Sequence, residues 1–143
     1  MLAALEEHGL EEVEMVGDGN CQFRALAHQW FGSEEHHASL RTAVVQQLKD
    51  WPERYKVWET AEFDYEFWVD RMALDGVEWG TGLTLRAAAD LLGAEIHVFE
   101  DDLSEGQMYI HYEPSEKTTT RVLRLVFRSR RGHYNSVREI RAQ

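Results

Sequence analysis

Apolar residues recur every three or four positions through residues 21–92, which is the spacing of amphipathic helices. Four stretches carry this pattern, and breaks rich in glycine, proline or acidic residues separate them. We therefore predict four helices. The predicted helices, with the residues expected to face the core, are 21–30 (Phe23, Leu26, Ala27, Trp30), 34–50 (Leu40, Val44, Leu48), 64–74 (Trp68, Met72, and Tyr65 or Phe67) and 84–92 (Leu85, Ala88, Ala89, Leu92).

Residues with strong conformational preferences mark where these helices begin and end. Gly32 and Gly93 follow the first and fourth helices, and glycine adopts the left-handed backbone of a helix C-terminus without strain. Ser33 and Thr84 are predicted to cap the second and fourth helices, because a hydroxyl group can accept from the free N–H groups of a first turn. Pro52 is predicted to break the second helix, since the residue before a proline avoids the helical backbone.

The spacing changes to two after the fourth predicted helix, and this alternation favours β-strands. It predicts strands near residues 96–98, 109–112 and 122–127, and more loosely over residues 12–16. Because helices come first and strands later, we predict an α+β fold rather than a doubly wound parallel sheet. The length supports one compact domain over residues 1–143.

The composition is that of an ordinary globular protein, with 43% hydrophobic residues. No stretch approaches the roughly 20 apolar residues of a membrane helix, and no signal peptide is visible. The single cysteine excludes an intrachain disulfide and a cysteine-rich zinc site. We therefore expect a protein without membrane association that works inside the cell, in the cytoplasm or the nucleus.

The charge is strongly negative and unevenly distributed. The net charge is −11, which argues against nucleic acid as a partner. Residues 121–143 contain seven arginines and one acidic residue, Glu139, so residues 1–120 alone carry a net charge of −17. This acidic part is either a solvated surface or a face that attracts a basic partner.

The most informative residue is Cys21, the only cysteine. A lone cysteine is most often a small buried hydrophobic residue, but this one follows the loop Gly17-Asp18-Gly19-Asn20 and begins a predicted helix. The positive end of the helix dipole is expected to lower the pKa of the thiol toward a reactive thiolate. Gly19 and Asn20 are predicted to form an oxyanion loop, whose backbone N–H groups converge near the sulfur.

His133 is the histidine best placed to act as a base, because it follows Gly132 in a segment that can return to Cys21. Asn135 would project to the same side of an extended chain. We predict that its side-chain oxygen accepts the Nδ1–H of His133 and leaves Nε2 facing the thiol. The other histidines form no ligand cluster that the sequence can identify, so we expect no metal and no cofactor.

Three motifs, in order, resemble those of the ovarian tumour (OTU) family of cysteine deubiquitinases. They are Asp18–Ala27, then Glu78-Trp79-Gly80 with Leu83–Asp90, and finally His133–Val137. The resemblance implies a papain-like fold, with helices around a small, mostly antiparallel sheet. It also implies hydrolysis of isopeptide and peptide bonds at the C-terminal glycine of ubiquitin. Where close relatives often carry an Asp-His pair after Trp-Gly, this chain has Thr81-Gly82.

By position, the resemblance implies that Cys21 is the nucleophile and His133 the general base. Asp18 matches the family's aspartate before the nucleophile, and Asn135 matches a position that orients the histidine in many members. The sequence leaves open which of the two contributes more, although physical chemistry favours Asn135 as orienter and Asp18 as organiser of the loop. A ubiquitin-binding pseudoenzyme and a thiol enzyme for another ubiquitin-like modifier are the alternatives.

The expected partner is ubiquitin or polyubiquitin, and the expected state is a monomer. Trp79 and Tyr134 are predicted to form the walls of a channel for the Gly-Gly tail of ubiquitin. Acidic residues could pair with the arginines that precede those glycines, or could simply be solvated charges. The acidic candidates are Glu34, Glu35, Asp64, Glu66, Asp70 and Glu78.

Overall fold

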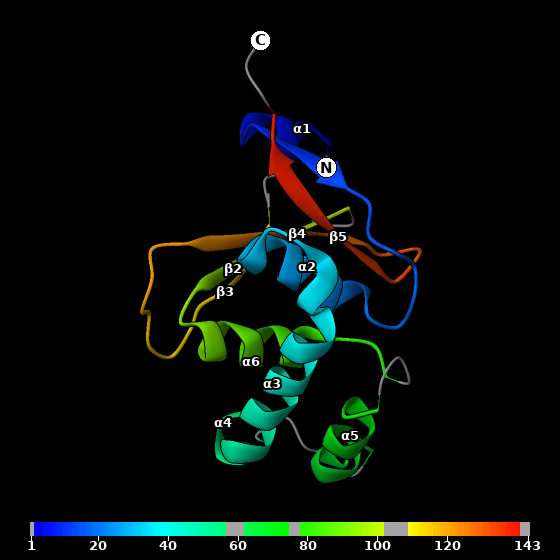
Figure 1. Ribbon diagram of the computed structural model, residues 1–143, viewed down its shortest axis with the longest axis vertical. Helices are drawn as coiled ribbons and strands as arrows, with labels where there is room; N and C mark the ends of the chain where they lie inside the picture. The colour runs from blue at the N-terminus through cyan, green and yellow to red at the C-terminus, as the bar shows by residue number, and fades with distance from the viewer. Residues whose placement is uncertain (1, 57–61, 75–77, 102–108, 141–143) are drawn as a thin grey trace.

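A five-stranded sheet with most of its helices on one face forms the molecule (Figure 1). The computed structural model describes residues 2–56, 62–74, 78–101 and 109–140. Its elements are α1 (Leu2–Glu7), β1 (Leu10–Val13), α2 (Cys21–Phe31), the 3₁₀ turn η1 (Glu34–His36), α3 (His37–Asp50), α4 (Pro52–Tyr55), α5 (Tyr65–Met72), α6 (Gly82–Leu92), β2 (Glu95–Glu100), β3 (Ile110–Tyr112), β4 (Val122–Arg128) and β5 (His133–Glu139).

The strands lie in the order β1-β5-β4-β2-β3. In this sheet β1 pairs with β5, β5 with β4, and β2 with β3 in the antiparallel sense, whereas β2 and β4 run parallel. Their parallel pairing follows from the long connection that leaves β2 through β3 and returns to β4. The sheet is therefore mixed but mostly antiparallel, as expected, and the α+β class is confirmed.

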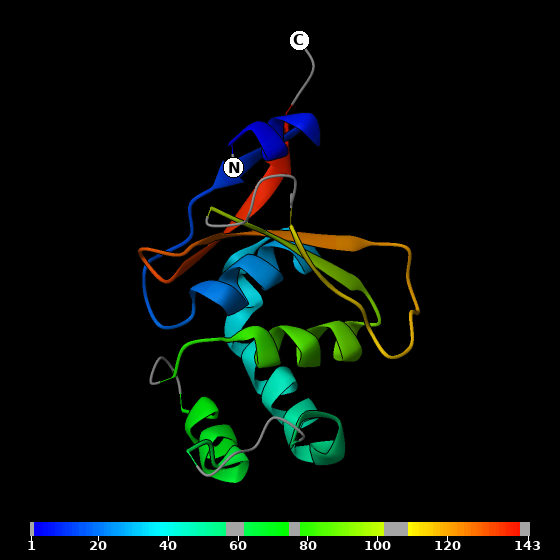
Figure 2. The same cartoon turned by 180° about the vertical axis from the view of Figure 1, so that it is seen from behind.

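Alternation along β4 separates two hydrophobic cores. Leu123 and Leu125 face the main core with α2, α3 and α6, and Val126 faces the smaller cluster beneath α1. Figure 2 shows α2 directly against the sheet, with α3 and α5 farther from it. In this arrangement the helix α2 packs against the strand β5, and both elements carry residues of the candidate site.

The helices agree closely with the prediction, because caps and apolar spacing are local signals. Gly32 and Gly93 both have the left-handed backbone at the ends of α2 and α6. On α5, Tyr65 rather than Phe67 faces the core, since Tyr65 is 2% exposed and Phe67 62%. Pro52 does end α3 at Asp50, but it also begins the short helix α4.

Several boundaries were wrong. The cap of α6 is Thr81, and Thr84 sits three residues inside as its reciprocal partner in a capping box. Ser33 caps only the 3₁₀ turn η1. The first strand is residues 10–13 rather than 12–16, because its register follows β5. Of the loop before α6, residues 75–77 lie outside the described residues.

Three elements were not predicted, the helices α1 and α4 and the strand β5. β5 has buried side chains on both faces over its first five residues, so alternation is absent from its sequence.

Within the described part of the chain, no helix combines the length and the apolar character needed to span a membrane.

Candidate active site

Cys21 lies against the strand β5, on the face of the sheet that α2 covers. Cys21 is the first residue of α2, and its side chain is 6% exposed. The backbone N–H of Tyr134, 113 positions later in the chain, donates to the Cys21 Sγ over 3.4 Å. This contact brings the thiol beside His133, the neighbouring residue on β5.

Burial raises the pKa of the Cys21 thiol above its ordinary value, contrary to our expectation from the helix dipole. The backbone N–H groups of Tyr134, Gln22 and Cys21 itself point at the sulfur and favour the thiolate, and Asp18 opposes them. Desolvation outweighs these donors because the side chain is almost fully covered. Burial therefore favours the protonated thiol, which needs a base beside it to react.

His133 and Asn135 form the predicted pair, but through the other ring nitrogen. Nε2–H of His133 donates to the Asn135 Oδ1 over 2.8 Å, where we expected Nδ1–H. Both side chains are on one face of β5 and are buried, at 5% and 0% exposure. The prediction was wrong about the orientation of the His133 ring, because the spacing of residues in the sequence carries no information about it.

Two further contacts determine which way the Asn135 amide points. The backbone N–H of Met15 donates to Oδ1 over 2.8 Å, and Nδ2 donates to the Glu12 carboxylate over 2.6 Å. A backbone donor requires the oxygen on its side, and a carboxylate requires the nitrogen. Since Oδ1 only accepts, Nε2 of His133 must carry a proton, and in the neutral ring Nδ1 keeps its lone pair.

Glu12 and Arg128 were missed by sequence reasoning. Arg128, on β4, donates through its guanidinium to both carboxylate oxygens of Glu12, on β1. These hydrogen bonds lower the pKa of Glu12 against the opposing effect of its partial burial. The position of Glu12 on a predicted strand was a weak signal, but its partners depend on the pairing of β1 with β5.

A further acid, Glu14, lies beside the same histidine. Its carboxylate is 3.6 Å from the His133 Nε2 and pairs with Arg131 over 2.6 Å. The hydrogen bond from Arg131 is the main reason that the pKa of Glu14 is lowered. Because the side chain is 59% exposed, its field at His133 is weakened by solvent.

Asp18 organises the loop before the thiol. Its carboxylate accepts from the guanidinium of Arg24 and, over 2.9 Å, from the backbone N–H of Asn20. The Arg24 contact is the main reason that the pKa of Asp18 is lowered. The Asn20 N–H is therefore engaged, and the N–H groups of Cys21 and Gln22 are the loop-end donors that face the sulfur. The expectation that the Asn20 N–H would point at the sulfur was therefore wrong.

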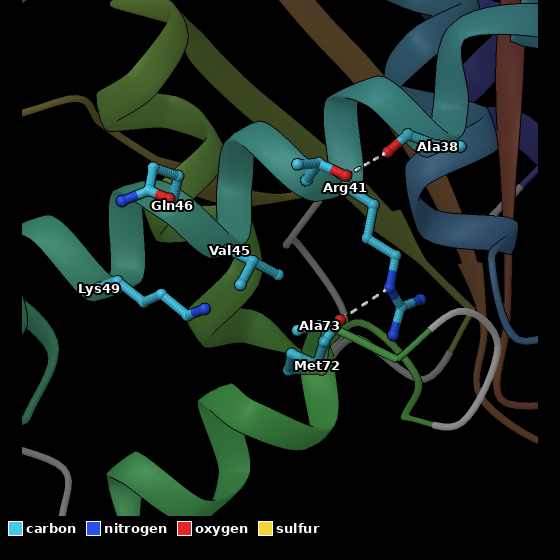
Figure 3. A pocket seen from close by; sticks show the side chains of 8 residues that line it. Ala38, Arg41, Val45, Gln46, Lys49, Met72 and Ala73 are labelled. Atoms are coloured by element: carbon cyan, nitrogen blue, oxygen red, sulfur yellow. Dashed lines mark hydrogen bonds between the residues drawn. The ribbon is translucent and has the colours of Figure 1, made fainter.

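The buried Arg41 holds the same loop from behind. Its guanidinium donates to the Gly19 backbone oxygen and to the Asn20 Oδ1, over 3.3 and 2.9 Å. It also donates to the Met72 oxygen over 3.0 Å (Figure 3) and to the Glu78 oxygen over 2.6 Å. Arg41 thus joins the loop before Cys21 to the end of α5 and the segment containing Trp79. Its place directly after Leu40 on a core-facing helix was a signal that we did not use.

A hollow of about 230 Å³ opens beside the thiol. Trp79 forms one wall, 56% exposed, and its ring lies against Gly132, where any side chain would crowd it at 3.2 Å. Gly80 is similarly required, because an added side chain would meet the Gln22 amide at 2.3 Å. The hollow is lined by Gly17, Asp18, Cys21, Trp79, Arg131, Gly132 and His133.

Tyr134 does not line that hollow. Its side chain points to the opposite face of β5 from His133, is 8% exposed, and packs on Phe127 with ring centres 4.6 Å apart. Desolvation raises the pKa of its hydroxyl group, which also hydrogen-bonds with Gln22. Its contribution to the site is therefore the backbone N–H.

Several of the acidic candidates already have partners within the chain. Glu34 pairs with Arg24, Glu78 with Arg71, and Glu66 with Lys56. Asp64 caps α5 by accepting from the backbone N–H of Phe67. A basic ligand would have to compete with these contacts, so the acidic face is less available than its charge suggests.

A thiol at the start of a helix that lines one hollow with a histidine, itself bonded to an asparagine, is the arrangement typical of a papain-like thiol hydrolase site. Comparison with known proteins makes the class more specific. The sequence model of the OTU-like cysteine proteases matches residues 16–134. The chain belongs to this family.

The similar curated proteins include plant enzymes. The chain is 41% identical over 136 residues to OVARIAN TUMOR DOMAIN-containing deubiquitinating enzyme 11 of Arabidopsis thaliana, covering 93% of this chain and 52% of that protein. It is 37% identical to enzyme 12 of the same series and organism, covering 99% of this chain and 62% of that protein. The chain thus spans between half and two thirds of the length of these relatives.

Solved structures share the fold. The OTU domain of OTUD1 superposes with a TM-score of 0.79 at 23% identity, covering 96% of this chain and 91% of that one. An OTU domain in complex with ubiquitin superposes with a TM-score of 0.72 at 18% identity, covering 90% and 69%. The papain-like OTU architecture implied by the sequence motifs is thereby confirmed.

Proposed function

We propose that this domain is a cysteine-type deubiquitinase that cleaves isopeptide and peptide bonds after the C-terminal glycine of ubiquitin. The observation that carries the proposal is the hydrogen bond of Tyr134 to the Cys21 sulfur, which aligns the thiol with the His133–Asn135 pair. The names of the plant relatives, all deubiquitinating enzymes, support the substrate class. Ubiquitin or polyubiquitin is the proposed partner, and a monomer the proposed acting unit.

In the proposed mechanism, Nδ1 of His133 takes the proton from the Cys21 thiol as the sulfur attacks the glycine carbonyl. The Nε2–H bond to Asn135 keeps the ring in the tautomer that has its lone pair on Nδ1. The backbone N–H groups at the start of α2 stabilise the oxyanion. His133 then returns the proton to the leaving lysine amine, and water hydrolyses the thioester.

In the same proposal, Asp18 acts on the loop and not on the imidazole, because its carboxylate is engaged by Arg24 and the Asn20 N–H. Trp79 and Gly132 are the proposed walls for the narrow Gly-Gly tail, since they border the hollow beside Cys21. Two glycines suit such a space because they carry no side chains.

The test is covalent labelling with ubiquitin that carries a C-terminal propargyl group. We expect one adduct per chain on Cys21 and none in the Cys21→Ala variant, with ubiquitin chains cleaved by the parent only. No adduct with an intact fold would overturn the proposal in favour of a binding pseudoenzyme. Labelling only by another ubiquitin-like modifier would overturn the substrate assignment.

A further inference from the structure

A second cluster of chemically capable side chains lies on the far part of the sheet. Glu95 and His97 are on one face of β2, and His111 is directly opposite His97 on β3. One ligand atom from each of the three lies within 4.8 Å of the others. The strand β4 separates β2 from β5, so the cluster is remote from His133.

The distances within the cluster are unusual for hydrogen bonds. Nε2 of His97 is 3.5 Å and Nε2 of His111 is 3.6 Å from the Glu95 carboxylate oxygens. Good N–H···O bonds are shorter than this, at about 2.7–3.2 Å. Two ligands on one tetrahedral zinc ion, each bonded at about 2.0–2.2 Å, are separated by roughly 3.3–3.5 Å. The two distances from the histidines to Glu95 therefore suit a shared ion better than direct hydrogen bonds.

His97 gives an independent indication. It is 8% exposed, and its Nδ1 is buried without a hydrogen-bond partner among the described residues. Tyr109 stacks on the ring, with ring centres 4.2 Å apart and planes 8° apart, and so holds its orientation. Its other ring nitrogen, Nε2, faces Glu95, and a buried imidazole with one nitrogen unpaired requires an explanation.

We propose that Glu95, His97 and His111 bind one divalent transition-metal ion of the zinc type, with water completing its coordination. Two histidines and one carboxylate are a donor set that zinc accepts. The ion would link β2 to β3 at the edge of the sheet. It would stabilise this edge and take no part in hydrolysis at Cys21.

Two neighbouring cations limit the affinity. Lys117 Nζ lies 3.4 Å from Glu95, and Arg124 is directly opposite His97 on β4. Their charges repel a divalent ion. The lysine side chain is 49% exposed and can move away, so we expect micromolar rather than nanomolar binding.

The test is calorimetric titration with Zn²⁺ alone, in a Cys21→Ser background that removes the thiolate as a competing ligand. We expect one ion per chain. Adding His111→Gln should weaken binding at least tenfold, and Lys117→Met should strengthen it by removing a competing cation. The matched control is His36→Gln, which removes an exposed histidine from η1 and should change nothing.

A second measurement guards against misfolded variants. The melting temperature of the Cys21→Ser protein should rise with Zn²⁺, and that of the His111→Gln variant should not, although both start from similar values. Equal zinc affinity in the His111→Gln and His36→Gln variants would overturn the proposal, as would the absence of stoichiometric binding in the Cys21→Ser protein.

Discussion

The Asn135 side-chain amide donates to the Glu12 carboxylate over 2.6 Å, which ties the pair on β5 to the first strand. Glu12 in turn is held by Arg128 from β4. Side chains from the strands β1, β4 and β5 therefore together orient the Asn135 amide oxygen toward His133. Groups that orient the ligands of metal sites commonly contribute about 10- to 100-fold to activity, and we expect a contribution of similar size here.

We predict that Glu12→Ala lowers kcat about tenfold and leaves KM nearly unchanged, because it releases the Asn135 amide without touching the substrate. Glu12→Gln should be milder, since its oxygen can still accept from Nδ2. Steady-state cleavage of a fluorogenic ubiquitin substrate measures both parameters. Glu11→Ala is the matched control, because Glu11 is exposed and pairs only at the surface with Arg138. A kcat loss as large in the control would refute the assigned role.

Replacing Asn135 with alanine should reduce kcat about 10- to 100-fold, because the ring of His133 then loses its tautomer and orientation. His133→Ala should be nearly as damaging as Cys21→Ala, since thiol and base act as one unit. Single-turnover cleavage by the three variants gives this ranking. Full activity of the Asn135 variant would mean that another group, such as Glu14, orients the histidine.

The thiol should be unreactive on its own. Burial raises the pKa of Cys21, so less thiolate exists at a given pH than for an ordinary cysteine. In the His133→Ala variant, we expect alkylation by iodoacetamide to rise only above about pH 8.5, the ordinary thiol range. Glutathione treated in parallel provides the reference curve. A midpoint for the variant below that of glutathione would show that the helix dipole outweighs burial.

The Asp18–Arg24 pair should make a small contribution to stability that depends on pH. The pKa of Asp18 is lowered in the folded protein, so its stabilisation is present above the unfolded value of about 3.9 and is lost as pH falls through the folded value. Asp18→Asn should therefore reduce the free energy of unfolding more at pH 7 than near pH 2. Urea titrations at the two pH values test this. An equal difference at both would exclude the ion pair as its cause.

Arg41→Met should destabilise the domain by about 3–5 kcal/mol, because it leaves buried carbonyl oxygens without donors. Arg41 is 4% exposed and donates to four different backbone oxygens. Urea unfolding measures the loss, with Lys49→Met on the same helix as the exposed control. If the two variants were equally stable, the proposed link from the Gly19–Asn20 loop to α5 would not matter energetically.

Local signals in the sequence were sufficient for much of the helical framework. The apolar spacing of α2 and the glycine that ends it depend on residues within about four positions of each other. A short stretch of sequence is therefore enough to predict them. The same holds for the nucleophile motif, in which Asp18, Cys21 and Arg24 are one turn apart. The error at Thr84 arose because Thr81 offers the same hydroxyl group one turn earlier, and only the path of the chain selects between them.

The sequence by itself determined most of the helices, the α+β class and the candidate thiol, histidine and asparagine. Tertiary structure alone decided the burial of Cys21, the ring nitrogen that faces Asn135, and the contributions of Glu12, Arg41 and Arg128. Each of these depends on segments separated by 20 to more than 100 positions, such as Glu12 and Asn135, 123 apart. Contacts at such separations follow from how sheet and helices pack, and hydrophobic spacing does not specify strand register or side-chain partners.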